Sequence, residues 1–354
     1  AVTPTFLHNL EARMEAIMSQ EYQRLLQDMW WQEVATERPS VSKLDRLVWL
    51  LDTAMIIRLE EGSMQVEDLM AQYHEYESQF AGAGFKLTKQ QLEDVYNGMP
   101  GGEALELAGA WSRQIGFQSA YWPQHEVAKA IREGGAAGSL TYDGLPFFST
   151  GHFVNGVNNE DGTFSNIITA AVLNAAGLGS AAPSIHEFGT GAVTADVALQ
   201  NIQRCKAYIA SIKMPNGRDP RKLRARGILV PPAISGRAQQ ITNAKFIAQA
   251  AASGGGGADV EAVIRNFGIG QPIEADELGS AAGGSDTSYY IIATADGTNP
   301  GALVYVNREP FNVQFHGPEA SPELARKREL QWLTGGRNVV GYGHPFKLFR
   351  VDAS

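Results

Sequence analysis

A helical period of apolar residues marks the beginning of the chain. These residues follow one another at steps of three and four, so they share one face of a helix. They are Leu7, Leu10, Met14, Ile17, Met18, Tyr22, Leu25 and Met29. Thr3 suits an N-cap, and Pro4 suits the first helical position. The pattern predicts an amphipathic helix over residues 3–29, which packs on its own domain or, as an arm, on a neighbouring subunit.

Large aromatic residues gather in the next segment, residues 30–86. Trp30, Trp31 and Trp49 stand among apolar runs that polar breaks separate, and we predict strands with a hairpin-like excursion. Aromatic side chains of this size are enriched at interfaces as well as in cores. Because the segment is poorly patterned for a core of its own, we expect at least two of the three tryptophans to be buried only in contacts with adjacent subunits.

A capping box opens the following helical region. Thr88 is the N-cap candidate, and Gln91 follows three residues later. Apolar residues continue at helical spacing, but Pro100-Gly101-Gly102 and then Pro123 interrupt the pattern. We therefore predict a series of separate helices over residues 88–134.

The rest of the chain divides into long blocks of loop, helix and strand. Residues 135–192 are rich in Gly, Ala, Asn and Ser and predict mostly loop. Helical spacing returns over residues 194–213 and from 233 to about 251, with a buried strand at 227–232 between them. The last hundred residues are mostly strand. Long helices followed by long strands indicate an α+β fold.

Size and composition narrow the class of protein. With 354 residues, the chain is long enough for two or three domains. Its hydrophobic share of 44% and charged share of 19% are ordinary for a globular protein. No apolar run reaches the roughly 18 residues that indicate a membrane span, and the sequence from Ala1 lacks the pattern of a secretory signal. Ala1 fits either removal of an initiator Met or proteolytic maturation.

Charge and cysteine content exclude further classes. A net charge of −9 argues against a protein that grips nucleic acid through its phosphates. The single cysteine, Cys205, cannot form an internal disulfide, which suits a reducing cytoplasm. A cysteine-based zinc site needs several ligands and is excluded as well.

None of the common catalytic or ligand-binding motifs is complete. The chain has no P-loop and no Gly-x-Ser-x-Gly nucleophile elbow. Gly189-Thr190-Gly191-Ala192 is only a fragment of a dinucleotide fingerprint, and a flexible hinge explains it better. The seven histidines include no His-x-x-x-His pair, and the stretch 158–162 would place apolar residues at two ligand positions of an EF-hand. The sequence therefore predicts no catalytic, cofactor-binding or metal site.

A basic run, Arg221-Lys222-Leu223-Arg224-Ala225-Arg226, stands out in this acidic chain. A solvated connection that pairs with acidic neighbours explains it best, because the chain as a whole is negative. A nucleic-acid patch is the second interpretation. In the third, the run meets a carboxylate cluster such as Glu274, Asp276 and Glu277 across a boundary between subunits.

Four segments form a pattern through their order along the chain. They are Phe85–Asp94, Tyr142–His152, Arg226–Pro232 and Arg328–Pro345. In this order they resemble four parts of the major head subunit of Mu-like tailed bacteriophages. Those parts are the start of the spine helix, the segment after it, an axial-domain strand that ends in a double proline, and the closing strands. The resemblance covers roughly residues 85–354 without 251–287, whereas residues 1–84 match by role and position alone.

The resemblance implies the fold of tailed-phage major capsid proteins. This is an α+β fold with an N-terminal arm, an extended loop, a spine helix, a peripheral domain and an axial domain. The implied division is an arm helix at 1–29, an extended loop at 30–86, the spine helix and first part of the peripheral domain at 87–190, the axial domain at 191–305, and the second part of the peripheral domain at 306–354.

The implied function is structural, with no cofactor and no catalytic centre. As a major capsid subunit, the chain would assemble as pentamers and hexamers into an icosahedral shell around the double-stranded DNA of a phage. Implied partners are further copies of the chain, scaffolding and portal proteins, decoration proteins, and DNA through weak contact, but no membrane. The expected location is the virion, after assembly in the host cytoplasm. The interface candidates are Leu7, Leu10, Met14, Trp30, Trp31, Trp49, Arg221, Arg224 and Arg226.

Two alternatives stay open. One is a cytosolic enzyme with a Gly-rich nucleotide loop, and the other is a non-viral nanocompartment shell of the same fold. Some capsids of this fold join a lysine of the extended loop to an asparagine of the next subunit, and Lys43 and Asn338 lie in the matching regions. The sequence shows neither desolvation of this lysine nor a carboxylate beside it, so we expect no cross-link.

Overall fold

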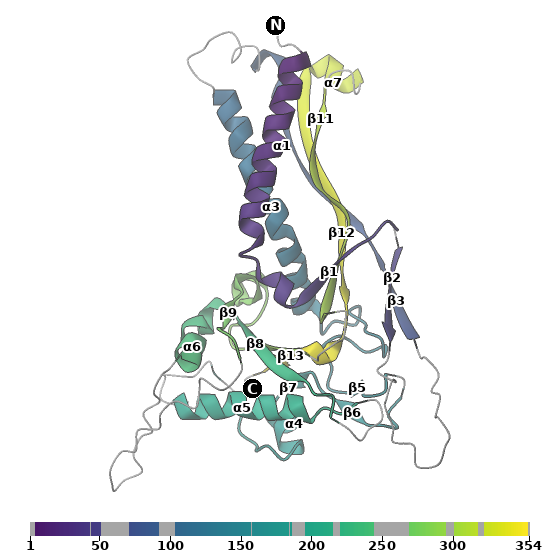
Figure 1. Ribbon diagram of the computed structural model, residues 1–354, viewed down its shortest axis with the longest axis vertical. Coiled ribbons are helices and arrows are strands. Elements are labelled where there is room, and N and C mark those ends of the chain that lie inside the picture. Colours follow the sequence, from purple (N-terminus) through teal and green to yellow (C-terminus); the bar gives the residue numbers. More distant parts are fainter. Residues whose placement is uncertain are drawn as a thin grey trace, which may run out of the picture.

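The structure is a computed structural model of the chain. It describes residues 4–42, 44–50, 71–91, 103–156, 158–183, 185, 195–214, 220–243, 269–294, 301–317 and 322–352. Figure 1 shows an elongated upper part built from two long helices beside a long sheet, and a broader lower part built around a second sheet.

The upper sheet has the strand order β1-β11-β12-β4. Its strands are β1 (Ala35–Pro39), β4 (Gln79–Thr88), β11 (Leu303–His316) and β12 (Glu329–Tyr342). β11 and β12 form a long antiparallel pair, and the short helix α7 (Pro322–Lys327) lies between them in sequence. β4 pairs antiparallel with β12, whereas β1 runs parallel to β11.

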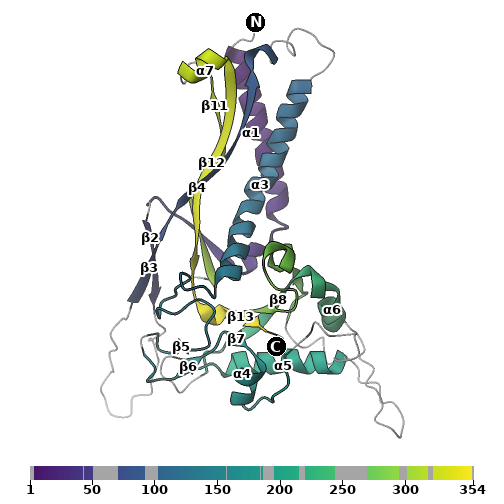
Figure 2. The same ribbon diagram turned by 180° about the vertical axis from the view of Figure 1, so that it is seen from behind.

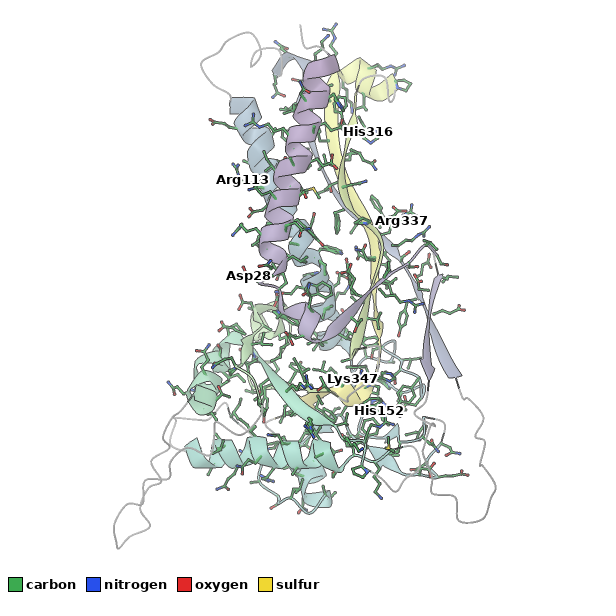
Figure 3. The ribbon with its side chains drawn as sticks, viewed as in Figure 1. Asp28, Arg113, His152, His316, Arg337 and Lys347 are labelled. Carbon is green, nitrogen blue, oxygen red and sulfur yellow. The ribbon has the colours of Figure 1, made fainter. Side chains whose placement is uncertain are left out.

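Two helices, α1 (Pro4–Leu26) and α3 (Glu103–Glu133), lie side by side along one face of this sheet (Figures 1 and 2). Met14 of α1, Ile115 of α3 and Trp332 of β12 belong to one buried apolar cluster. Arg113 of α3 points away from the sheet (Figure 3). The helix pair therefore supplies the second layer of the upper part.

The lower sheet has the order β7-β13-β10-β8-β9. Its strands are β7 (Ile167–Ile168), β8 (Arg224–Val230), β9 (Ile273–Glu274), β10 (Tyr289–Thr294) and β13 (Leu348–Val351). Three helices pack around it, namely α4 (Ala170–Ala175), α5 (Ala195–Ser211) and α6 (Pro232–Asn243). Short 3-10 helices η3 (Asp276–Leu278), η4 (Ser280–Ala282) and η5 (Pro345–Lys347) connect the strands, and η1 (Trp30–Glu33) joins α1 to β1.

A two-stranded hairpin stands beside the upper sheet (Figure 1). β2 (Leu44–Leu50) pairs antiparallel with β3 (Ala71–Glu77). Its contact with the upper sheet includes the hydroxyl of Tyr76, which accepts a hydrogen bond from the N–H of Tyr342 at 3.0 Å. A second, shorter pair is formed by β5 (His152–Phe153) and β6 (Thr163–Phe164).

Most of the elements predicted from periodicity are confirmed. The N-terminal helix, the strands and hairpin of residues 30–86, the helix at 194–213 and the terminal strands are all present. The capping box is closed in both directions: the N–H of Thr88 donates to Gln91 Oε1 at 2.9 Å, and the N–H of Gln91 donates to Thr88 Oγ1 at 3.3 Å. Local sequence signals therefore fix the element boundaries at these positions.

The interruption predicted at Pro123 is wrong, because Pro123 lies inside the continuous helix α3. A proline in a helix interior removes one hydrogen bond and costs about 3 kcal/mol. Ile115 before it and Val127 and Ile131 after it are all buried. Tertiary packing on both sides of the proline outweighs the local penalty and keeps the helix continuous.

The domain division stays a prediction, with one qualification from the topology. β11 and β12 lie in the upper sheet, but β13 lies in the lower sheet between β7 and β10. Residues 306–354 therefore do not all belong to one sheet. Several predicted features lie outside the described residues. They are Lys43, the interruption at 100–102, the glycine motif at 189–192 and the part of the predicted helix beyond residue 243.

Candidate assembly surfaces

The N-terminal helix packs along the long helix of its own chain. Leu10, Met14 and Met18 of α1 are buried in the cluster that α3 and β12 share. A Cβ placed on Gly116 of α3 would lie 2.7 Å from the main-chain oxygen of Met18, so the two helices approach closely at this glycine. The expected role of Leu10 and Met14 as contacts to other subunits is corrected, because both side chains are buried inside one chain. The side chain of Leu7 is outside the described residues.

Trp30 and Trp31 are also buried within the single chain, at 7% and 2% exposure. The indole of Trp31 packs against the ring of Tyr305 at 5.4 Å between centroids. The N–H of Trp30 donates to Gln124 Oε1 at 3.1 Å. The expectation that at least two tryptophans are buried only on assembly is therefore wrong. Contacts from distant segments cover both rings, and the sequence pattern around them did not reveal these contacts.

Trp49 belongs to β2, but its side chain is outside the described residues. Its interface role stays a prediction.

A buried carboxylate joins the lower part of the molecule to α3. Glu277 of η3 accepts from the Trp30 indole at 3.3 Å and from Gln124 Nε2 at 2.7 Å. Its main-chain oxygen accepts from Arg132 of α3 at 2.5 Å. Burial acts to raise the pKa of Glu277, but hydrogen bonds from Tyr121, Gln124 and Trp30 outweigh it and hold this pKa below its usual value. Glu277 is thus bonded within its own chain, which argues against the third interpretation of the basic run as far as this carboxylate is concerned.

A second buried pair holds the segment that follows α3. His152 Nδ1 lies 2.7 Å from Asp143 Oδ2, and neither side chain is exposed. His152 Nε2 faces the main-chain oxygen of Phe147 at 3.0 Å, so both ring nitrogens face acceptors. Asp143 also accepts from the N–H groups of Leu145 and Phe153 at 3.1 and 3.3 Å. Burial acts to raise the pKa of Asp143, but the interactions with His152 and the hydrogen bonds from Thr141 and Leu145 together outweigh it and lower this pKa.

The Asp143–His152 pair folds the segment from Tyr142 to His152 into a closed loop at the junction below the long sheet (Figure 3). The sequence marked this segment through the family resemblance alone. It gave no sign that Asp143 and His152 are partners, because many loops contain both residue types.

The basic run is divided between core and surface. Arg221 is 6% exposed, and its guanidinium lies 4.0 Å from the ring centre of Phe346. Arg224 and Arg226 are exposed and alternate with buried Ala225 along β8. The prediction of Arg221 as an interface residue is corrected, because its side chain is buried against Phe346. The alternation along β8 places the two later arginines at the surface. Arg224 and Arg226 stay candidates.

Ligand chemistry finds little support in the described part of the chain. No group of three or more His, Cys, Asp or Glu side chains among these residues could hold a metal ion. Within the same residues, no helix has the length and apolar character needed to cross a membrane. Cys205 is buried, and burial raises the pKa of its thiol to about 12, so the thiol stays protonated at neutral pH.

Comparison with known proteins gives a family for the first part of the chain. Residues 7–176 match the family model described as the Mu-like prophage major head subunit gpT. No curated protein sequence matches the chain. The match includes residues 7–84, where the sequence had indicated similarity by role and position only. It leaves out the segments near 226–232 and 328–345.

Solved structures give the fold. The capsid of the cyanophage P-SCSP1u is similar at a TM-score of 0.50 and 14% identity, over 92% of this chain and 88% of that one. The procapsid of bacteriophage JBD30 has a TM-score of 0.46 and 14% identity, over 100% of this chain and 76% of that one. A virus-like particle from Pyrococcus furiosus has a TM-score of 0.46 and 9% identity, over 96% and 98%.

Together, these findings confirm the resemblance that the sequence indicated. The closely packed helices α1 and α3, the long upper sheet and the lower sheet form an α+β architecture that is similar to the cyanophage capsid. Residues 7–176 carry the sequence pattern of the Mu-like major head subunits, and the chain as a whole has the fold of a tailed-phage major capsid protein.

Proposed function

We propose that this protein is the major capsid subunit of a Mu-like phage or prophage and that it assembles into a closed icosahedral shell. The match of residues 7–176 to the major head subunit family carries the proposal. The capsid fold supports it independently, because the similarity spans 92% of the chain. In such a shell, many modest contacts repeated by symmetry supply the stability.

The proposed partners follow from this role. Other copies of the chain are the principal partner, in pentamers and hexamers. Scaffolding, portal and decoration proteins would act at defined stages or positions, and double-stranded DNA would fill the interior. The net charge of −9 fits a wall that makes only weak contact with DNA. The location would be the virion, after assembly in the host cytoplasm.

Two other functions are less well supported. A non-viral nanocompartment would share the fold, but the family that matches in sequence is that of a prophage head subunit. A nucleotide-binding enzyme rested on the glycine motif at 189–192, which lies outside the described residues. Family and fold are those of structural proteins, so the side chains described above are assigned to folding and assembly.

Light scattering after size-exclusion chromatography, together with electron microscopy, tests the proposal. The purified chain, alone or with a scaffolding protein, should give closed particles of megadalton mass. A protein that stays at the mass of a monomer or dimer under both conditions would show that the proposal is wrong. Particles that contain a cargo enzyme in place of DNA would favour the nanocompartment.

A further inference from the structure

A small cavity lies where the two long helices meet the upper sheet. It has a volume of about 200 Å³ and is lined from α1, η1, β1, α3 and β11, which lie next to one another in Figure 1. Trp31, Pro123 and Tyr305 are buried and form its floor, whereas Glu15 and Glu37 stand exposed at its rim. Because the rim is exposed, a small solute can reach the floor.

The backbone is irregular on both sides of this cavity. On the sheet side, the register of β11 against β12 shifts twice between Asn307 and Asn312. On the helix side, Pro123 has no N–H to donate to the carbonyl of Ser119, four residues earlier in α3. All four residues line the cavity. Bulged strands are common beside functional sites, so this part of the fold is a candidate for ligand binding.

Hydrogen-bond acceptors that lack a donor collect at the cavity. Asn307 Nδ2 donates to Glu37 Oε1 at 3.0 Å. An ionised carboxylate can only accept, so this bond fixes the amide with Oδ1 turned away from Glu37. Asn307 Oδ1 is buried and has no donor among the described residues, and its cross-strand neighbour Asn338 does not supply one. Together with the carbonyl of Ser119, it leaves two uncharged acceptors for a ligand that donates.

The charge of the cavity is negative. Glu15 and Glu37 line it, and none of the described lining residues is a lysine, an arginine or a histidine. Glu37 is near enough to act on the ring of Tyr22, since burial raises the pKa of Tyr22 and the charge of Glu37 raises it further. The cavity therefore favours a ligand of positive charge.

Aromatic rings form much of the remaining wall. Trp31 and Tyr305 pack at 5.4 Å between ring centroids and at an angle of 56°, so their rings form a corner. Tyr22 and Phe311 line the cavity as well. An organic ammonium ion is attracted to such ring faces, and its methylene groups pack against them. A metal ion needs a shell of oxygen ligands in place of these rings, so the wall favours an organic cation.

The volume indicates how large this cation is. About 200 Å³ corresponds to about seven water molecules at the roughly 30 Å³ that each occupies in the liquid. A chain of about six non-hydrogen atoms, such as 1,4-diaminobutane, fits this space together with one water molecule. Trp31 Nε1 is buried without an acceptor among the described residues, and such a water molecule would accept its N–H. The two ammonium groups of a diamine match the two carboxylates in number.

We propose that this cavity binds a short aliphatic diamine. One ammonium group donates to the carbonyl of Ser119, to Asn307 Oδ1 and to the carboxylate of Glu37. The other ammonium group meets Glu15 at the rim, and the carbon chain between them lies on the aromatic wall. The bound diamine joins α1, β1, α3 and β11, so it stabilises the contact between the helices and the upper sheet. The site lies within one chain and does not depend on the proposed function.

Titration calorimetry of the full chain with 1,4-diaminobutane tests the site. About 0.15 M NaCl screens the general attraction between the acidic chain and any cation. One diamine should bind to each chain. Butylamine, which has one ammonium group, should bind about tenfold more weakly or less, and the neutral 1,4-butanediol should show no binding. Equal binding of the diamine and the diol, or displacement of the diamine by an equal concentration of Mg²⁺ or Ca²⁺, would overturn the proposal.

Substitutions separate this site from general attraction by a negative surface. Glu15→Gln and Glu37→Gln should each weaken diamine binding about tenfold or more, because each removes a charge-assisted hydrogen bond. Glu33→Gln is the matched control, since Glu33 is exposed and is not among the lining residues, and it should change binding less than about twofold. An equal effect of Glu33→Gln and Glu37→Gln would overturn the proposal.

A variant without any change of charge tests the floor of the cavity. Pro123→Ala supplies an N–H to the carbonyl of Ser119, so this acceptor is no longer open to the ligand. Diamine binding should weaken about fivefold, while thermal unfolding without diamine confirms that the variant is folded. In the wild type, the diamine should also raise the melting temperature, and it should do so much less in Glu37→Gln. Unchanged diamine binding by folded Pro123→Ala would show that no ammonium group reaches the floor and would overturn the proposed site.

Discussion

The hydrogen bonds that Glu277 accepts from Trp30 and Gln124 lead to a specific prediction about the stability of the subunit. Glu277→Ala leaves the Trp30 indole N–H and Gln124 Nε2 buried without their acceptor. Each buried group left unpaired costs about 1–3 kcal/mol, so the free energy of unfolding should fall by about 2–4 kcal/mol. Glu277→Gln keeps one acceptor oxygen and should cost about half as much. Asp276→Asn, an exposed neighbour with the same change of charge, is the control and should cost less than about 0.5 kcal/mol.

Denaturant unfolding of the unassembled subunit, followed by tryptophan fluorescence, measures these differences. The pH dependence gives a second, independent readout. Because the pKa of Glu277 is lower in the folded chain than in the unfolded chain, its charged form contributes stability above the unfolded pKa. That contribution is lost as the pH falls through the folded pKa. The gap between wild type and Glu277→Gln should therefore narrow in acid. Equal free energies of unfolding for Glu277→Ala and Asp276→Asn at neutral pH would show that the buried hydrogen bonds of Glu277 do not stabilise the subunit.

Three further predictions concern other sites. Gly116→Val should push α1 away from α3 and lower the free energy of unfolding of the subunit by about 1–3 kcal/mol. Gly138→Ala is the control, because a Cβ at Gly138 meets no atom within 4 Å, and it should change the free energy of unfolding little. Thermal unfolding of both variants measures the difference. Burial and the charges of nearby Lys347 and Arg221 lower the pKa of His344 to about 3. The unfolded chain therefore binds a proton at this residue first, and the free energy of unfolding falls as the pH drops from about 6.5 towards 3. Urea titrations should show a flatter pH profile for His344→Gln than for the wild type, and identical profiles would contradict the assignment. Trp49→Ala should weaken shells more than it lowers the melting temperature of free subunits, and the reverse order would place this tryptophan in an internal core.

Local patterns predicted the elements of this fold well. Steps of three and four located α1, and Thr88 with Gln91 marked a capped helix start that the structure confirms. Alternation and turn residues indicated the strands of the last hundred residues. These signals succeed because they depend on residues that are close in sequence.

The failures all involve contacts between distant residues. Trp30 meets Glu277 across 247 positions, and no periodicity records such a pairing. Pro123 stays inside a helix because the packing around it is stronger than its local penalty. Arg221 is buried against Phe346, which follows it by more than one hundred positions. The candidate surfaces were therefore misjudged wherever a large or charged side chain was covered by a remote segment.

The strand order of the two sheets determines when each sheet can form while the chain is being synthesised. The upper sheet pairs β1, which begins at Ala35, with β11, which begins at Leu303. The lower sheet joins β7, which begins at Ile167, to β13, which ends at Val351. Neither sheet can close until the ribosome has released these late strands, and such non-local pairing is slow. A growing chain therefore has neither sheet complete for most of its synthesis, and the early strands β1 and β7 stay without these partners until the C-terminal strands have emerged. Unpaired edges of this kind favour aggregation, so rapid closure of both sheets protects the newly made chain.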